Sequence, residues 1–324
     1  MSTPPTTRAS RLRLAISIGV VAVLIAGFFY ALPGLRLSEV AGSLGRARIL
    51  PLVLAAIAAL TMHVFRAMFW RLVLRPPQPI PLWRFVRYTI IGSASSALLP
   101  ARAGEAVRVW LLSELEHVPA VEAIGAALAE RALDVASMVL VLAPLPWLLP
   151  DAPHWVTRAL WLLTLAGAVI VIAVSLLARR GGREPGTGLV GRLARALAPL
   201  ASPARLGLAL LILLAAWLLD LAALMLVARS LGLALPPAAP LLVLLSVNLA
   251  IAVPAAPAQL GSHEAGTLVA LSLLHVDRPD AIAFALLYHA AHVLPLLVAA
   301  ALDAPLLVRA LRRSRSNTSS ASAD

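Results

Sequence analysis

One charged cluster interrupts a chain that is otherwise mostly alanine, leucine and valine. In the stretch LLPARAGEAVRVW, Arg102, Glu105 and Arg108 follow the helix-breaking Pro100. If a short helix begins near Ala103, its free N–H groups and its dipole favour an anion, and the two arginines add positive charge. An interfacial helix whose arginines extend to water has the same pattern. The cluster therefore predicts either an anion-binding site or an interfacial anchor.

A second charged cluster lies within a long apolar segment. The sequence AERALD places Glu130, Arg131 and Asp134 at helical spacing, so that all three can lie near one face of a helix. Two carboxylates and one arginine leave one acid without a cation, and Arg102 or Arg108 can supply it. Ionisable groups inside a membrane are costly and are functional candidates. We predict that these residues form an ion-pair network, contact a substrate, or do both.

A third cluster contains most of the remaining polar side chains of the apolar segments. It consists of His263, Glu264, His289 and His292, with Tyr288 beside them. Histidine and carboxylate ligands suit zinc, but this spacing matches no standard zinc motif. Histidines also act as hydrogen-bonding groups or carry protons. We assign the third cluster, like the first two, to substrate binding, and we predict no metal ion and no cofactor.

The composition shows which elements must position these clusters. The chain is 61% hydrophobic and only 13% charged, which is typical of a membrane protein rather than of a soluble domain. A membrane-spanning helix needs about 20 mostly apolar residues. The sequence has six such runs, at residues 14–32, 49–69, 122–149, 155–178, 206–230 and 281–308.

The absence of cysteine excludes disulfides and thiolate nucleophiles. The net charge of +12 comes from arginines near the membrane boundaries, so anionic lipid headgroups are the expected partners and nucleic acid is not.

The distribution of arginine predicts the orientation of the chain. Cytoplasmic loops carry an excess of basic residues. The N-terminus, residues 71–87, residues 179–205 and the tail are rich in arginine, whereas residues 150–157 have none. We therefore predict an integral protein of a bacterial cytoplasmic membrane with both termini in the cytoplasm. The polar tail, residues 314–324, is expected to be disordered.

Two stretches are too short and too rich in proline and glycine to be single spans, and they are expected to be hairpins of short helices. They lie at residues 84–112 and 240–276. Within them, PARAGEA and PAQLGSHEA share proline, glycine and Glu-Ala. The following segments, residues 117–135 and 275–293, align without gaps and both begin with His-Val.

These matches predict two halves, residues 10–149 and 150–310, inserted with opposite orientation, as in many transporters. The predicted fold is an all-α polytopic membrane protein with about six long transmembrane helices and two broken hairpins, which are either re-entrant or barely span the membrane. It forms one integral membrane domain, residues 1–324. Asp220 lies in an apolar run of the second half and needs a partner, for which His63 or Arg66 on the equivalent helix is available.

The clusters also resemble a known family. The chain resembles the transmembrane, flippase-like domain of lysylphosphatidylglycerol synthases and its stand-alone relatives. The resemblance extends over about residues 10–310. Three motifs carry it: Pro-x-Arg-x-Gly-Glu-x-x-Arg at Pro100, Arg102, Gly104, Glu105 and Arg108; Glu-Arg-x-x-Asp at Glu130, Arg131 and Asp134; and Pro…Gly…Glu at Pro257, Gly261 and Glu264. Ala258 and Gln259 replace a glycine pair expected after Pro257, and Tyr288-His289 stand where relatives often have an arginine.

The resemblance implies a helical bundle that moves lipids between leaflets, with glycosylated polyprenyl phosphates and hopanoids among the lipids linked to stand-alone relatives. The chain ends just past the last apolar run, so we expect no synthase domain and no enzymatic activity. We predict a flippase or transporter for an anionic or isoprenoid lipid. An intramembrane transferase acting on a lipid-linked substrate, and a non-transporting subunit that assists lipid-biosynthesis enzymes, remain as alternatives.

Overall fold

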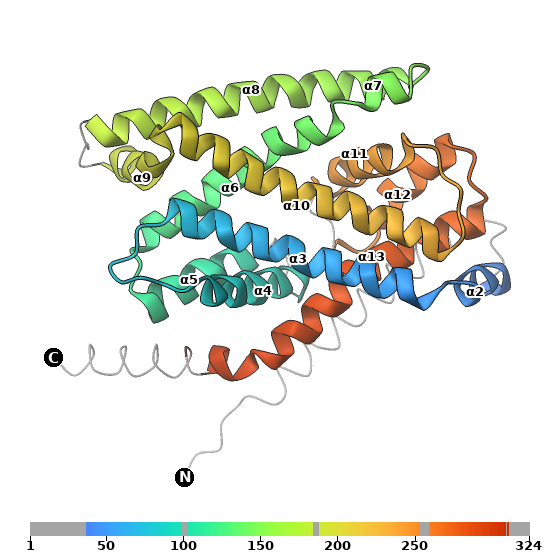
Figure 1. Ribbon diagram of the computed structural model, residues 1–324, viewed down its shortest axis with the longest axis horizontal. Coiled ribbons are helices and arrows are strands. Elements are labelled where there is room, and N and C mark those ends of the chain that lie inside the picture. The colour runs from blue at the N-terminus through green and yellow to red at the C-terminus, as the bar shows by residue number, and fades with distance from the viewer. Residues whose placement is uncertain (1–36, 99–102, 184–187, 253–258, 309, 311–324) are drawn as a thin grey trace, which may run out of the picture.

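The computed structural model describes residues 37–98, 103–183, 188–252, 259–308 and 310, and all regular elements in this part of the chain are helical (Figure 1). Five helices are long: α3 (Ile49–Val73), α6 (Ala120–Leu142), α8 (His154–Arg183), α10 (Pro203–Ser230) and α13 (Arg278–Leu302). The shorter elements are α2 (Leu37–Gly45), α4 (Leu82–Leu98), α5 (Gly104–Glu116), α7 (Leu145–Leu148), α9 (Leu189–Leu197), the 3₁₀ turn η2 (Ala198–Ala201), α11 (Ala239–Ile251) and α12 (Ser262–Leu273). The predicted run at 14–32 and the tail at 314–324 lie outside the described residues.

Most of the long helices are apolar enough to contact lipid. Four of them, α3, α8, α10 and α13, are long and apolar enough to cross a membrane. Helix α8 buries only 11% of its most apolar window inside the protein, and Leu162, Leu165, Val169 and Leu176 along it are exposed. Exposed apolar surface on this scale marks contact with a membrane or partner. The chain is therefore an integral membrane protein, and α6, which carries the AERALD cluster, is the long helix that does not meet the same criterion.

Helices α3 and α10 form a central antiparallel pair (Figure 1). Ala55 near the start of α3 shares an apolar cluster with Val227 near the end of α10, and the Arg48 N–H donates to the Ser230 carbonyl at 2.8 Å. At the other end of the pair, Val73 shares a second cluster with residues of the first turns of α10. Alanines along both helices allow the backbones to approach closely, as in other membrane bundles.

The two predicted hairpins are present, and they pack toward opposite ends of the central pair (Figure 1). In the first hairpin, α4 and α5 touch at glycines: a Cβ on Gly104 would overlap the Gly92 carbonyl oxygen and the Ser96 side chain. In the second hairpin, a Cβ on Gly266 of α12 would lie 2.6 Å from the Val247 Cα of α11. Each hairpin is thus closed by a backbone contact that a side chain would prevent.

The turn after each hairpin has the same conformation. His117 and His275 both adopt a left-handed backbone, with φ of 55° and 56°. The following residue turns back in each case, so that the Val118 N–H bonds to the Leu112 carbonyl and the Val276 N–H bonds to the carbonyl of Leu271. These are the two His-Val positions that the sequence alignment pairs. The order of long, short, short and long helices recurs from α3 to α6 and from α10 to α13, and opposite membrane insertion of the halves stays a prediction.

Two apolar clusters divide the interior. The first joins the end of α3 to α4, α5 and the first half of α6, with Trp70, Leu111 and Leu133 fully buried. The second joins the end of α10 to α11, α12 and the first half of α13, with Leu242 and Phe284 at its centre. Buried charged and polar residues gather where the elements of the two clusters meet.

Candidate functional site

A cavity of about 580 Å³ opens where the two clusters meet. Both hairpins contribute to its wall, together with α3, α6, α8, α10 and α13. Its polar lining includes His63, Glu105, Arg108, Asp220, Asn248 and His263. Side chains from all three sequence clusters therefore face one space, although they come from distant parts of the chain.

Arg66 of α3 organises the wall formed by the first half. Its Nη1 lies 3.0 Å from Glu130 Oε1, and its Nη2 lies 3.1 Å from Asp134 Oδ2. The other oxygen of Glu130 accepts hydrogen bonds from Trp70 Nε1 at 2.5 Å and from Arg108 Nη2 at 2.6 Å. The Arg108 guanidinium also stacks over the Trp70 ring, 4.0 Å from its centroid. The two buried acids are thus held by the buried Arg108 and the half-buried Arg66, as charges require at this depth.

Arg131 lies on a different side of α6, so the prediction of one common face for Glu130, Arg131 and Asp134 is wrong for Arg131. Glu130 and Asp134 are buried, whereas Arg131 is exposed and forms an ion pair with Glu105 of α5. Both members of this pair line the cavity. The predicted network between helix and hairpin is therefore confirmed in two layers, an inner one through Arg108 and an outer one through Arg131. Direct substrate contact by these residues stays a prediction.

The wall formed by the second half uses histidines and a tyrosine where the first uses arginines. The Tyr288 hydroxyl donates to Asp220 Oδ1 at 2.7 Å, and His292 Nε2 lies 2.9 Å from the same oxygen. Asp220 therefore pairs with α13 rather than with His63 or Arg66. Instead, His63 Nδ1 lies 3.4 Å from the Ser93 hydroxyl of α4.

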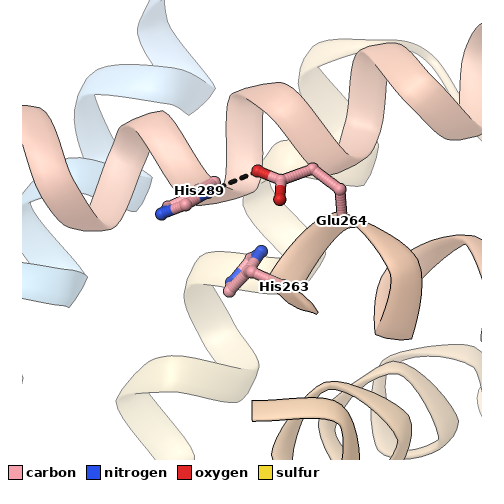
Figure 2. A group of neighbouring side chains, drawn as sticks. All are labelled: His263, Glu264 and His289. Atoms are coloured by element: carbon pink, nitrogen blue, oxygen red, sulfur yellow. Dashed lines mark hydrogen bonds and ion pairs between the residues drawn. The ribbon is translucent and has the colours of Figure 1, made fainter. Parts of the chain in front are cut away.

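Three side chains of the third sequence cluster converge at the start of α12 (Figure 2). His289 Nδ1 lies 2.5 Å from Glu264 Oε1, and the other oxygen of Glu264 accepts the Gly261 N–H at 2.7 Å. Gly261 has φ of +85°, which glycine tolerates best and which turns its N–H back toward that carboxylate. The His263 ring stacks on His289, with centroids 4.5 Å apart. His292 belongs to the Asp220 group and not to this one.

The two halves differ in the kind of charge that they bring to the cavity. Among the described residues that line it, the permanent cations all come from the first half: Arg66, Arg108 and Arg131. The carboxylates come from both halves: Glu105, Glu130, Asp134 and Asp220. The cavity thus combines a fixed ion-pair network on one side with titratable groups on the other.

Most predicted site residues are brought together, and some important ones were not predicted. Gly104 closes the first hairpin and Gly261 begins the turn before α12, whereas Pro100, Arg102 and Pro257 lie outside the described residues. The sequence suggests Arg66 only as a partner for Asp220, and it gives no indication of a role for Trp70. Arg66 is a charged residue inside the apolar run at 49–69, and this position is the signal in the sequence that could have identified it as a site residue.

The sequence also matches a known family. The sequence model of the lysylphosphatidylglycerol synthase TM region matches residues 12–300.

The chain belongs to this family.

The family match includes every residue that lines the cavity. No curated protein matches the chain as a relative. The resemblance expected from the three motifs is therefore confirmed at the level of the family. In this member of the lysylphosphatidylglycerol synthase TM family, the first two motifs meet through Glu130 with Arg108 and through Arg131 with Glu105.

Proposed function

We propose that this protein moves the polar headgroup of a lipid between the leaflets of a bacterial cytoplasmic membrane. The observation that carries the proposal is the charged cavity where the two apolar clusters meet, inside a protein whose outer surface is apolar. Charged groups at such depth are costly, and they line substrate or ion pathways in transporters. The family description, a lysylphosphatidylglycerol synthase TM region, associates the fold with lipid chemistry.

The size of the cavity suits a headgroup and not a whole lipid. Its volume of about 580 Å³ falls in the range of roughly 300–1,000 Å³ that small-molecule sites occupy. Lipid tails need no polar path, because they can stay in the bilayer beside the exposed faces of the long helices. We therefore assign only the headgroup to the cavity.

The proposed cargo is an anionic phospholipid or an isoprenoid lipid with a phosphate. Arg108 and Arg131 present planar guanidinium groups, which match phosphate oxygens, and carboxylates already hold both in place. A phosphate that enters the cavity can compete with Glu130 for Arg108 or with Glu105 for Arg131. Such exchange of partners makes binding reversible, as transport requires.

The recurrence of the helix order supports alternating access. We propose that the halves are inserted in opposite orientations, with α4–α5 entering from the cytoplasm and α11–α12 from the other side. Each hairpin packs in its own apolar cluster at one end of the α3–α10 pair, so the hairpins can move against this pair while the cavity changes the side to which it opens. Both termini lie in the cytoplasm in this arrangement, and enzymes that make or use the lipid are the proposed partners.

Leaflet exchange in liposomes tests the proposal. Purified protein is reconstituted with fluorescent phosphatidylglycerol, a fluorescent polyprenyl phosphate or a zwitterionic control lipid, and the label exposed outside is quenched over time. We expect faster exchange of at least one anionic lipid than in protein-free liposomes. Arg131→Gln should slow this exchange, whereas Arg158→Gln, an exposed arginine at the start of α8, should not. Equal rates with and without protein for every lipid would overturn the proposal, and conversion of the lipid would favour the transferase alternative.

A further inference from the structure

Glu264 is a deeply buried carboxylate that lacks a permanent cation. The residue is only 4% exposed. Its described partners are His289 and the Gly261 N–H, and no arginine among the described residues forms an ion pair with it. A buried carboxylate costs several kcal/mol unless a cation or strong donors compensate it. A positively charged group beside the Glu264 carboxylate would therefore be stabilising.

The equivalent acid of the first half has an arginine as its partner, where Glu264 has a histidine. In the alignment of the two halves, Glu264 corresponds to Glu105, and His289 corresponds to Arg131. Glu105 is the less buried acid, with a side chain 32% exposed, and yet it has the permanently charged partner. The more buried acid instead has a histidine, which is a ligand for metal ions as well as a base.

His263 provides a second and independent observation. It lies two positions after the hairpin glycine Gly261 and is 8% exposed, yet its buried Nδ1 has no hydrogen-bond partner among the described residues. An unpaired polar atom in such a place needs an explanation. The ring lines the cavity and lies beside the Glu264–His289 pair (Figure 2). One ligand atom from each of these three residues lies within 4.8 Å of the others.

We propose that His263, Glu264 and His289 bind a zinc ion. Two histidines and one glutamate are the protein ligands of a common class of open zinc site, in which water or substrate takes the fourth position. Because His263 and His289 line the cavity, that fourth position faces the cavity. The three ligand atoms must approach to roughly 3.3 Å from one another to hold a zinc at about 2.0–2.1 Å. The ion compensates Glu264, gives the unpaired nitrogen of His263 a partner and adds positive charge to the histidine-lined wall.

The chemistry of the site suggests what the ion contacts. A zinc ion with one glutamate and two neutral histidines keeps a net positive charge, and a phosphate oxygen is a suitable fourth ligand. This role rests on the proposed function, since it requires a phosphate headgroup in the cavity. Binding of the ion itself does not rest on it.

Metal titration of the purified full chain tests the site. Protein in detergent is freed of metal with a chelator and titrated with zinc sulfate by calorimetry, and bound zinc is counted by elemental analysis after gel filtration. We expect one zinc per chain and a rise in the unfolding temperature on zinc addition. His263→Ala and Glu264→Gln should each weaken binding roughly tenfold or more and abolish the thermal shift. His154→Ala, which removes an exposed histidine at the start of α8, is the matched control and should bind normally.

Two results would overturn the zinc site: no saturable zinc binding by the wild-type chain at micromolar concentrations, or equal binding by the wild type and by His263→Ala. Gel-filtration profiles and circular dichroism show whether each variant is folded. If His263→Ala does not fold, Glu264→Gln, which preserves side-chain volume, serves as the test variant. The zinc measurement uses no lipid, so it separates the two proposals. Zinc binding without lipid exchange would overturn only the transport function, and exchange by a chain that binds no zinc would overturn only the metal site.

Discussion

Replacing Glu130 with glutamine tests whether the ion-pair network holds the first half together. Glu130 is 3% exposed and is the point where Arg66, Arg108 and Trp70 meet. Glutamine keeps the size of the side chain, and its amide oxygen can accept at most two of the three hydrogen bonds. It removes the negative charge, so that Arg108 is left without its carboxylate, while Arg66 keeps Asp134.

The expected cost follows from the burial of Arg108. Removing one partner of a buried ion pair costs about 3–5 kcal/mol, because the other charge stays buried. The hydrogen bonds that glutamine can retain, and the Trp70 ring under Arg108, place the cost at the lower end, near ~3 kcal/mol. That is roughly a hundredfold change in the folding equilibrium, since each ~1.4 kcal/mol is tenfold.

Unfolding in mixed micelles of increasing denaturing detergent measures this cost. Glu122→Gln, at the half-buried start of the same helix, is the control and should change the free energy of unfolding by less than about 0.5 kcal/mol. The double variant Glu130→Gln/Arg108→Met should cost less than the sum of the single variants, because it removes both charges, with a coupling of about 1–3 kcal/mol. A single-variant cost below about 0.5 kcal/mol, or strictly additive costs, would refute the reasoning.

Two further outcomes follow from the packing. Gly104→Ala should destabilise the protein by more than about 2 kcal/mol, because its Cβ overlaps the backbone of α4. Gly207→Ala, in the open first turns of α10, should be neutral or stabilising by up to about 1 kcal/mol. Thermal unfolding of both variants checks this, and equal unfolding temperatures would contradict it. Arg46→Ala should cost less than about 0.5 kcal/mol, because the side chain that pairs with Asp280 is 65% exposed; a loss above 1 kcal/mol in the same assay would show that this pair fixes α2 to α13.

Much of the helical arrangement could be predicted from local sequence. The apolar runs at 49–69 and 206–230 correspond to α3 and α10 within a few residues, because length and hydropathy decide whether a helix can span. The expected helix start near Ala103 corresponds to α5, which begins at Gly104. The run at 122–149 was predicted as one span, but the structure ends α6 at Leu142 and begins a separate short helix, α7. Pro144 and Pro146 explain this break, because proline lacks the N–H that a continuing helix needs.

The pairing of side chains was harder to predict. Spacing along one helix correctly placed Glu130 and Asp134 on a common face, but it could not show that Arg66, 64 and 68 positions away, lies between them. Contacts of this kind depend on which long helices are neighbours, and periodicity gives no information about that. The equivalence of the halves was the useful long-range signal. It paired His117 with His275, whose shared left-handed conformation the structure confirms.

The charges in the middle of α6 have a consequence for how the chain enters the membrane during synthesis. On insertion scales, each ionised residue at the centre of a helix costs about 2.5–3.5 kcal/mol, so Glu130 and Asp134 alone should discourage α6 from leaving the translocon into lipid. Arg66 lies on a helix that is synthesised earlier and that is apolar enough to insert by itself. If α3 waits beside the translocon, the Arg66 ion pairs can accompany α6 into the bilayer and offset that cost. The order of the helices in the gene is then part of the folding mechanism, because α6 is preceded by the helix that neutralises its carboxylates.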